Sequence, residues 1–175
     1  MIVETGFSWR GVGLYALVGV PLILLQYVLA REFDSAVPNI ALILVVHAAF
    51  FRGVHEAGVV ALMLGALADA QDAGFFGYHM VLAQISLIVT RILAERIFSE
   101  TGFFQSLVVL GLSLGYHVAG WLLLLTLTEG APTLGEYAKG APLTALVSAG
   151  TAFVLAALLT RMYRWPFFQL AKRGL

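Results

Sequence analysis

The longest uncharged stretch of the chain constrains its fold more than any other feature. No Asp, Glu, Lys or Arg occurs between Glu100 and Glu129, and residues 103–127 of that interval are mostly apolar. A helix needs about 20 apolar residues to cross the hydrocarbon core of a bilayer. The whole chain is 61% hydrophobic and 11% charged, whereas a soluble domain has about 25% charged residues. The sequence therefore predicts an all-α integral membrane protein.

Further apolar runs divide the chain in the same way and predict a six-helix transmembrane bundle in a single domain over residues 1–175. Pro38 opens the second of these runs, and proline is favoured in the first turn of a helix. We expect helices at about residues 12–30, 39–51, 57–68, 75–95, 103–127 and 141–160, followed by an interfacial basic tail at 161–175.

The second and third runs are each only about a dozen residues long, which is short for an independent span. They form either two short, tilted helices joined by a turn at Gly53 or one long helix broken there, and we favour two helices. With six spans and both termini in the cytoplasm, eight Lys and Arg residues lie inside and two, Arg31 and Lys139, lie outside, which together make the ten in the chain. This partition follows the positive-inside rule. A single broken helix would give an odd number of spans and mix the two sets.

The composition removes several classes of function. The formal net charge is zero, and the chain shows no nucleic-acid footprint. It has no cysteine, which excludes disulfides and cysteine-based metal sites. The 4 histidines are scattered over separate segments, without the i, i+4 spacing and third ligand of a zinc site in one helix. We therefore expect no cofactor, no metal and no enzymatic activity.

The segment 65–77 joins two apolar runs and places Asp69 and Asp72 between small residues. Such a pair could bind Mg²⁺ or act as acid and base, as aspartates do in lipid-head-group phosphotransferases. Those sites need further acids on the next helix to hold two metals, and none occurs here between Asp72 and Glu95. The favoured alternative is that both acids end a helix at the outer surface or stabilise the turn. Gly65 and Gly77 would permit a close approach or an unusual backbone angle there.

Arg91 and Glu95 lie four residues apart and can pair on one face of the fourth helix. This pair is either a solvated cytoplasmic helix end or a docking point for a cytoplasmic or juxtamembrane partner, and the sequence leaves both open.

Small residues at a spacing of four form two stripes that allow close contact between membrane helices. Such stripes serve packing within the bundle or association with another protein or a second copy, and we take internal packing as the default. The stripes consist of Ala57, Ala61 and Gly65 on the third helix and of Gly111, Gly115 and Ala119 on the fifth.

Three of these features together resemble the rod shape-determining protein MreD family. Pro38 opens the second run, Gly65-x-Leu67-x-Asp69 resembles the family's GLxxD segment, and Phe76-Gly77 takes the place of a Leu-Gly pair that follows it. The length, the number of spans and the basic C-terminal tail fit along the whole chain. The sequence departs from the family pattern in the phenylalanine at Phe76 and in the additional acid at Asp72.

The resemblance implies a non-enzymatic scaffold in the bacterial inner (cytoplasmic) membrane, within the cell-elongation complex that maintains rod shape and peptidoglycan synthesis. Its expected partners are an MreC-like protein, MreB, RodA, a class B penicillin-binding transpeptidase and membrane lipids. On this reading Asp69 caps the turn that follows it. The family also resembles, in fold, the S components of energy-coupling-factor transporters, so the alternative is a small-molecule-binding transport subunit. The pocket candidates for that alternative are few and scattered: Tyr78, Gln84, Tyr116 and His117.

Overall fold

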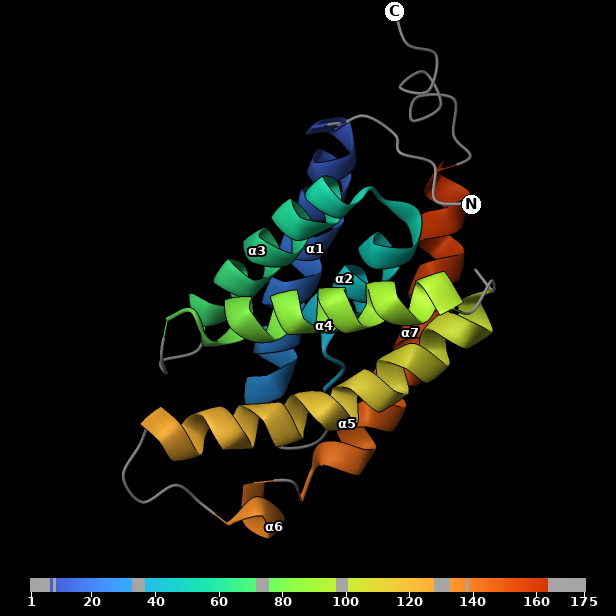
Figure 1. Cartoon of the computed structure of the whole chain (residues 1–175). Coiled ribbons are helices and arrows are strands. Elements are labelled where there is room, and N and C mark those ends of the chain that lie inside the picture. The colour runs from blue at the N-terminus through green and yellow to red at the C-terminus, as the bar shows by residue number, and fades with distance from the viewer. Residues whose placement is uncertain are drawn as a thin grey trace, which may run out of the picture.

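The computed structural model describes residue 7 and residues 9–32, 37–71, 76–96, 101–127, 133–137 and 139–163, and these contain helices and no strand. The predicted all-α class is therefore confirmed for the described chain. Figure 1 shows the helices in order: α1 (Trp9–Glu32), α2 (Ile40–Phe51), α3 (Val54–Asp69), α4 (Tyr78–Arg96), α5 (Gly102–Leu127), α6 (Leu134–Tyr137) and α7 (Ala141–Tyr163).

The six predicted helices correspond to α1–α5 and α7, and every bound agrees to three residues or fewer. The four-residue α6 was not predicted, and α7 continues through the first three residues of the predicted tail. The rest of that tail lies outside the described residues. Pro38 is not in the first turn of a helix, because α2 begins two residues later with Asn39 as its N-cap.

The chain between α2 and α3 is a true break. Arg52 has φ −119° and ψ 156° and ends α2, and Gly53 has ψ 156° and precedes α3. The amide of Ala57 then donates to the carbonyl of Gly53, which starts the new helix. Two helices, and not one long helix, therefore occupy this part of the chain.

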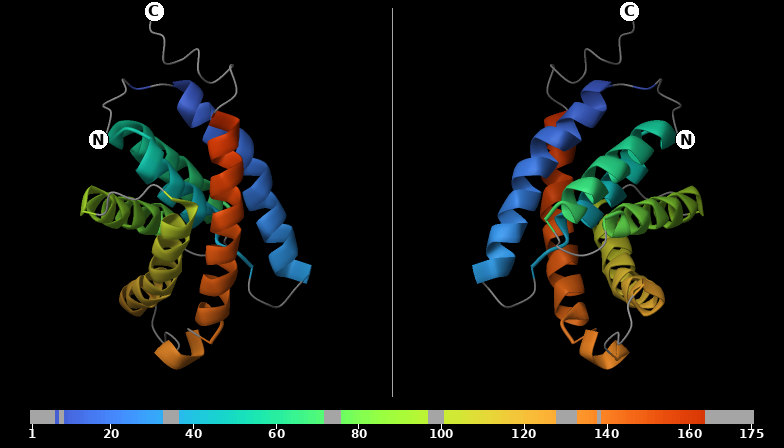
Figure 2. Two further views of the ribbon diagram at one scale, coloured as in Figure 1. Left: turned by 90° about the vertical axis from the view of Figure 1, so that its right-hand side faces the viewer. Right: turned by 90° about the vertical axis from the view of Figure 1, so that its left-hand side faces the viewer.

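Among the described residues, three helical segments, those of α1, α5 and α7, are long and apolar enough to cross a membrane. α2 has 12 residues and α3 has 16, which at a rise of about 1.5 Å per residue makes them about 18 and 24 Å long. Both are shorter than the hydrocarbon core of about 30 Å. Figures 1 and 2 also show α4 lying across the direction of α7. The described helices thus fit a membrane protein.

α2 lies at the centre of the fold. Nine of its 12 residues are buried, and it contacts α1, α3, α4, α5 and α7. Because other helices surround α2, a charged side chain on it would be buried, and the helix contains none. The longer helices are instead apolar on faces that remain exposed. On α4 these exposed positions form one stripe at helical spacing: Val81, Ile85, Ile88 and Ile92.

Candidate functional site

Asp69 ends α3, and its carboxylate caps α4. The Oδ1 atom accepts a hydrogen bond from the backbone N–H of His79 at 2.7 Å. The Oδ2 atom accepts from the N–H of Gly77 at 2.9 Å and from the N–H of Met80 at 3.3 Å. Amides at the start of a helix have no acceptor within that helix, and a negative charge there is favourable for the helix dipole. The buried carboxylate therefore fixes the direction in which α4 leaves the turn.

Two glycines complete this corner, which we call the Asp69 corner and define by Gly65, Asp69 and Gly77. A Cβ on Gly65 would lie 2.6 Å from the Cα of Met80, so the backbones of α3 and α4 are in direct contact there. Gly77 has a φ of 100°, which L side chains rarely adopt. The structure thus brings together three residues that the sequence singled out. The fourth, Asp72, lies outside the described residues.

The second cluster lies at the opposite end of α3 and consists of Arg52, Glu56 and Arg91; we call it the Arg52 cluster. Glu56 in the first turn of α3 is 1% exposed, and its Oε2 lies 3.6 Å from Nη1 of Arg52. The guanidinium of Arg91 donates from Nη2 to the backbone carbonyl of Arg52. Three charged side chains from three elements therefore meet where α2 ends.

Among the described residues no ion pair within 4.0 Å joins Arg91 to Glu95, although an electrostatic attraction between the two side chains remains. Arg91 is 8% exposed and turns inward, whereas Glu95 is exposed. An exposed pair at i, i+4 stabilises a helix by only about 0.2–0.5 kcal/mol. The carbonyl of Arg52 lies at a chain break, where no later amide of the same helix donates to it, and Arg91 supplies a donor instead.

His47 is enclosed next to this cluster and needs a polar partner at that depth. Its Nδ1 lies 2.8 Å from the hydroxyl of Tyr15, and both side chains are buried. The guanidinium carbon of Arg52 lies 5.9 Å from the centre of the Tyr15 ring. A Cβ on Gly11 would come within 2.9 Å of Nη1 of Arg52, so the glycine makes room for this arginine. The sequence indicated the need for a partner but not its identity, because Tyr15 is 32 residues away.

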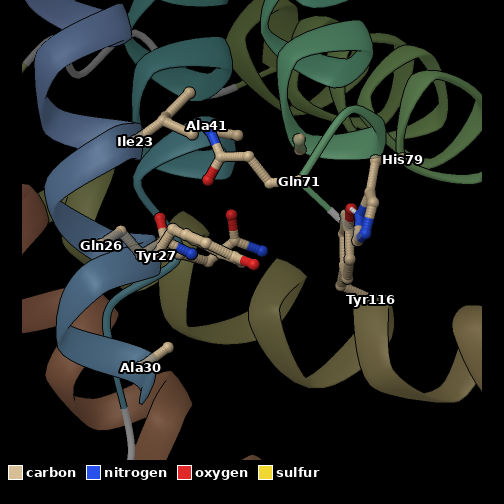
Figure 3. Close-up of a pocket in the computed structure, with 10 residues that line it drawn as sticks. Ile23, Gln26, Tyr27, Ala30, Ala41, Gln71, His79 and Tyr116 are labelled. Atoms are coloured by element: carbon tan, nitrogen blue, oxygen red, sulfur yellow. Dashed lines mark hydrogen bonds between the residues drawn. The ribbon is translucent and has the colours of Figure 1, made fainter. Parts of the chain in front are cut away.

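A cavity of about 220 Å³ lies beside the Asp69 corner, between α1, the start of α2, the end of α3, α4 and α5 (Figure 3). His79 and Tyr116 line it together, with Nδ1 of His79 at 2.7 Å from the hydroxyl of Tyr116. Of the four scattered pocket candidates, only Tyr116 lines this cavity. Gln84 donates to the carbonyl of Gly58, and Tyr78 pairs with the hydroxyl of Tyr137.

The two small-residue stripes have different surroundings. Ala57 and Ala61 are fully buried, and Gly65 contacts α4, as internal packing predicts. Gly111 and Gly115 on α5 are exposed, and a Cβ on either would meet no atom within 4 Å. The default of internal packing is therefore wrong for the second stripe, because α7 and the other neighbours of α5 contact a different face.

In the part of the chain that the structure describes, no three His, Asp or Glu side chains gather as metal ligands would. Comparisons with protein-family models, with curated proteins and with solved structures found no match to this chain. The family resemblance of segment 65–77 thus rests on the residues of that segment.

Proposed function

We propose that this protein is a non-enzymatic membrane scaffold that binds other proteins of the bacterial cell-elongation complex. The main support for the proposal is the role of the Asp69 carboxylate as a hydrogen-bond acceptor for α4. Its two carboxylate oxygens receive three backbone N–H groups of the turn and first residues of α4. The residues of segment 65–77 that resemble the MreD family thus have a structural role at the contact of two helices, which fits a protein without catalytic residues there.

The outer surface of the helices supports the same function. The apolar stripe of α4 is exposed, and Gly111 and Gly115 leave an open strip on α5. In a bilayer, exposed small residues let the backbone of a partner helix come close, where packing contacts stabilise the complex. We assign this strip of α5 to a membrane helix of a partner or of a second copy.

The topology that goes with this function has six spans, with both termini in the cytoplasm of a cell with an inner membrane. The exposed side chains of Glu95 and Arg96 at the end of α4 then face the cytoplasm. By resemblance, the partners are an MreC-like protein, MreB, RodA and a class B penicillin-binding transpeptidase.

The test is a pull-down of the full chain from its native membrane in a gentle detergent, with the bound proteins identified by mass spectrometry. Recovery of an MreC-like protein and wall synthases supports the scaffold. Recovery of a transmembrane coupling subunit with ATPases instead overturns it and favours the transport subunit. The variant Gly111→Leu with Gly115→Leu should lose most of the recovered partner. The matched control is Gly13→Leu on α1, where a Cβ also meets nothing within 4 Å.

A further inference from the structure

The cavity next to the Asp69 corner has a lining that helix packing alone does not require. We propose that it is a binding site for a small, uncharged ring compound whose oxygen atoms accept hydrogen bonds. This inference concerns a different part of the molecule from the partner strip on α5, and it holds whether or not the scaffold proposal does.

The size of the cavity limits the ligand. Its volume is about 220 Å³, whereas pockets for drug-sized ligands have about 300–1,000 Å³. A cavity of about 150 Å³ in another protein is large enough for benzene. The space therefore fits one substituted ring, either as a free compound or as the ring of a larger molecule that extends through the open side.

The charge of the lining disfavours strongly charged ligands. Among the described residues that line the cavity there is no Asp, Glu, Lys or Arg. The lining therefore offers an ionised ligand no direct counter-charge for the water that it would lose, and a neutral ligand is favoured. The polar groups are instead three carboxamides, two phenols and one imidazole: Gln26, Asn39, Gln71, Tyr27, Tyr116 and His79.

The hydrogen bonds already made by two carboxamides show what they can still offer. The Oε1 atom of Gln26 accepts from the N–H of Ile40 at 2.9 Å, and Oδ1 of Asn39 accepts from the N–H of Leu42 at 3.0 Å. A backbone N–H can only donate, so each of these side chains must present its oxygen to the backbone. What each amide adds to the site is therefore its NH₂ group, which is a donor.

Gln71 supplies the third donor. Its Nε2 is shielded from solvent and has no hydrogen-bond partner among the described residues. Figure 3 shows its side chain reaching from the end of α3 toward Ile23 and Ala41. A buried donor without an acceptor costs about 1–3 kcal/mol, and a turn of the Gln71 side chain toward a ligand oxygen in the cavity would remove that cost. Three NH₂ donors around a neutral cavity select a compound that is rich in acceptors.

The opposite wall is aromatic. The rings of His79 and Tyr116 lie nearly parallel, 16° apart, with their centres separated by 6.2 Å. Figure 3 places this pair across the cavity from Gln26 and Tyr27. The hydrogen bond between His79 and Tyr116 holds both rings in place, so the site has two fixed aromatic rings on one side and amide donors on the other. A hydroxylated ring or a lactam ring can accept hydrogen bonds from the amides and contact the aromatic rings.

The test measures thermal unfolding of the purified full chain in a polyoxyethylene detergent, whose head group contains no sugar. D-glucose and uracil are the neutral probes, with D-glucuronate and orotate as their charged counterparts. A neutral probe should raise the unfolding midpoint at concentrations at least about tenfold lower than its charged counterpart, because a ligand that binds the folded state stabilises it. The absence of any rise with both neutral probes and with dodecyl glucoside overturns the proposal.

The variant Gln71→Leu should weaken the response by about tenfold in concentration, the effect of one hydrogen bond. It removes an atom that lacks a protein partner, so it should fold. Ser113→Ala is the matched control, because Oγ of Ser113 is also buried without a described partner and Ser113 is not in the lining. An unchanged response in Gln71→Leu, or an equal loss in Ser113→Ala, contradicts the proposal. A response to dodecyl glucoside without one to free D-glucose assigns the ring to a lipid head group.

Discussion

α3 carries a buried carboxylate at each end, and the two ends are held in opposite ways. At its C-terminal end, Asp69 accepts hydrogen bonds from three backbone amides of another segment. At its N-terminal end, Glu56 lies near the side chain of Arg52, four residues earlier, at 3.6 Å. The first end is fixed by backbone groups, which cannot leave. The second depends on charged side chains, which can rearrange.

The helix dipole sharpens this difference. A carboxylate is favourable in the first turn of a helix and unfavourable in the last by about 0.3–1 kcal/mol. Glu56 obeys this rule within α3, whereas Asp69 breaks it for α3 and satisfies it for α4. An acid at the wrong end of one helix is therefore informative, because it indicates that another helix begins beside it. At the Asp69 corner a carboxylate joins two helices through backbone amides, whereas at the Arg52 cluster charged side chains join the ends of α2, α3 and α4.

The largest effect is expected from Asp69→Ala, which leaves three amides near the start of α4 without their acceptor. Stability should fall by about 3 kcal/mol, since hydrogen bonds to a charged group and helix caps are both lost. Unfolding of the purified chain in detergent, followed by circular dichroism, measures the loss. Asp69→Asn retains one acceptor oxygen and should lose about half as much. Equal stability of wild type and Asp69→Ala would show that the Asp69 corner does not hold α3 and α4 together.

A second test separates the close contact of α3 and α4 at the Asp69 corner from general effects of substitution on the stability of α3. Gly65→Ala places a Cβ against the backbone of Met80 and should destabilise by about 1–3 kcal/mol, because backbone atoms cannot move aside. Gly58→Ala is the matched control on the same helix, where a Cβ meets nothing within 4 Å. That control should be neutral or stabilising by up to about 1 kcal/mol through helix propensity. The comparison fails if both variants behave alike in thermal unfolding.

Substitutions in the Arg52 cluster should reduce stability less than substitutions at the Asp69 corner. Glu56→Gln should cost about 1–2 kcal/mol, because the side chain of Arg52 is 18% exposed and can turn toward water. A double-mutant cycle with Arg52→Gln should give a coupling of about 0.5–2 kcal/mol. Raising the salt concentration should reduce this coupling, whereas the effect of Asp69→Ala should stay constant. A larger loss in Glu56→Gln than in Asp69→Ala would reverse the ranking of the two ends.

The smallest effect concerns the neighbour of the cluster. Tyr15→Phe removes the hydroxyl that meets Nδ1 of His47 and keeps the buried ring, so stability should fall by about 1 kcal/mol. Tyr27→Phe is the control, since Tyr27 is 38% exposed and its hydroxyl can reach solvent. An equal loss of stability in both variants would show that the buried hydrogen bond between Tyr15 and His47 does not stabilise the protein measurably.

The parts of this protein that could be predicted from its sequence are those with local causes. Helix bounds follow from apolar runs that end at charges, glycines and prolines, and they agree with the structure to three residues or fewer. The Asp69 corner could also be predicted as a special place, because its acid and glycines lie within 13 residues. The bond from Asp69 to the N–H of His79 spans only 10 positions.

The parts that could not be predicted depend on how helices cross. Tyr15 meets His47 over 32 positions, His79 meets Tyr116 over 37, and Arg91 meets the carbonyl of Arg52 over 39. Periodicity places each side chain on a face of its own helix but does not say which face of another helix it meets. The cavity has the same origin, since five separate segments supply its lining.

The enclosed position of α2 also has a consequence for biosynthesis. This helix leaves the ribosome before α3, α4, α5 and α7, which are four of the five helices that cover it. At about 18 Å it is too short to cross the hydrocarbon core alone, and the carbonyl groups at its C-terminal end would meet lipid there. We therefore expect α2 to reach its final packed position late, after the later helices have entered the membrane. The order of insertion in this protein would then differ from the order of its sequence.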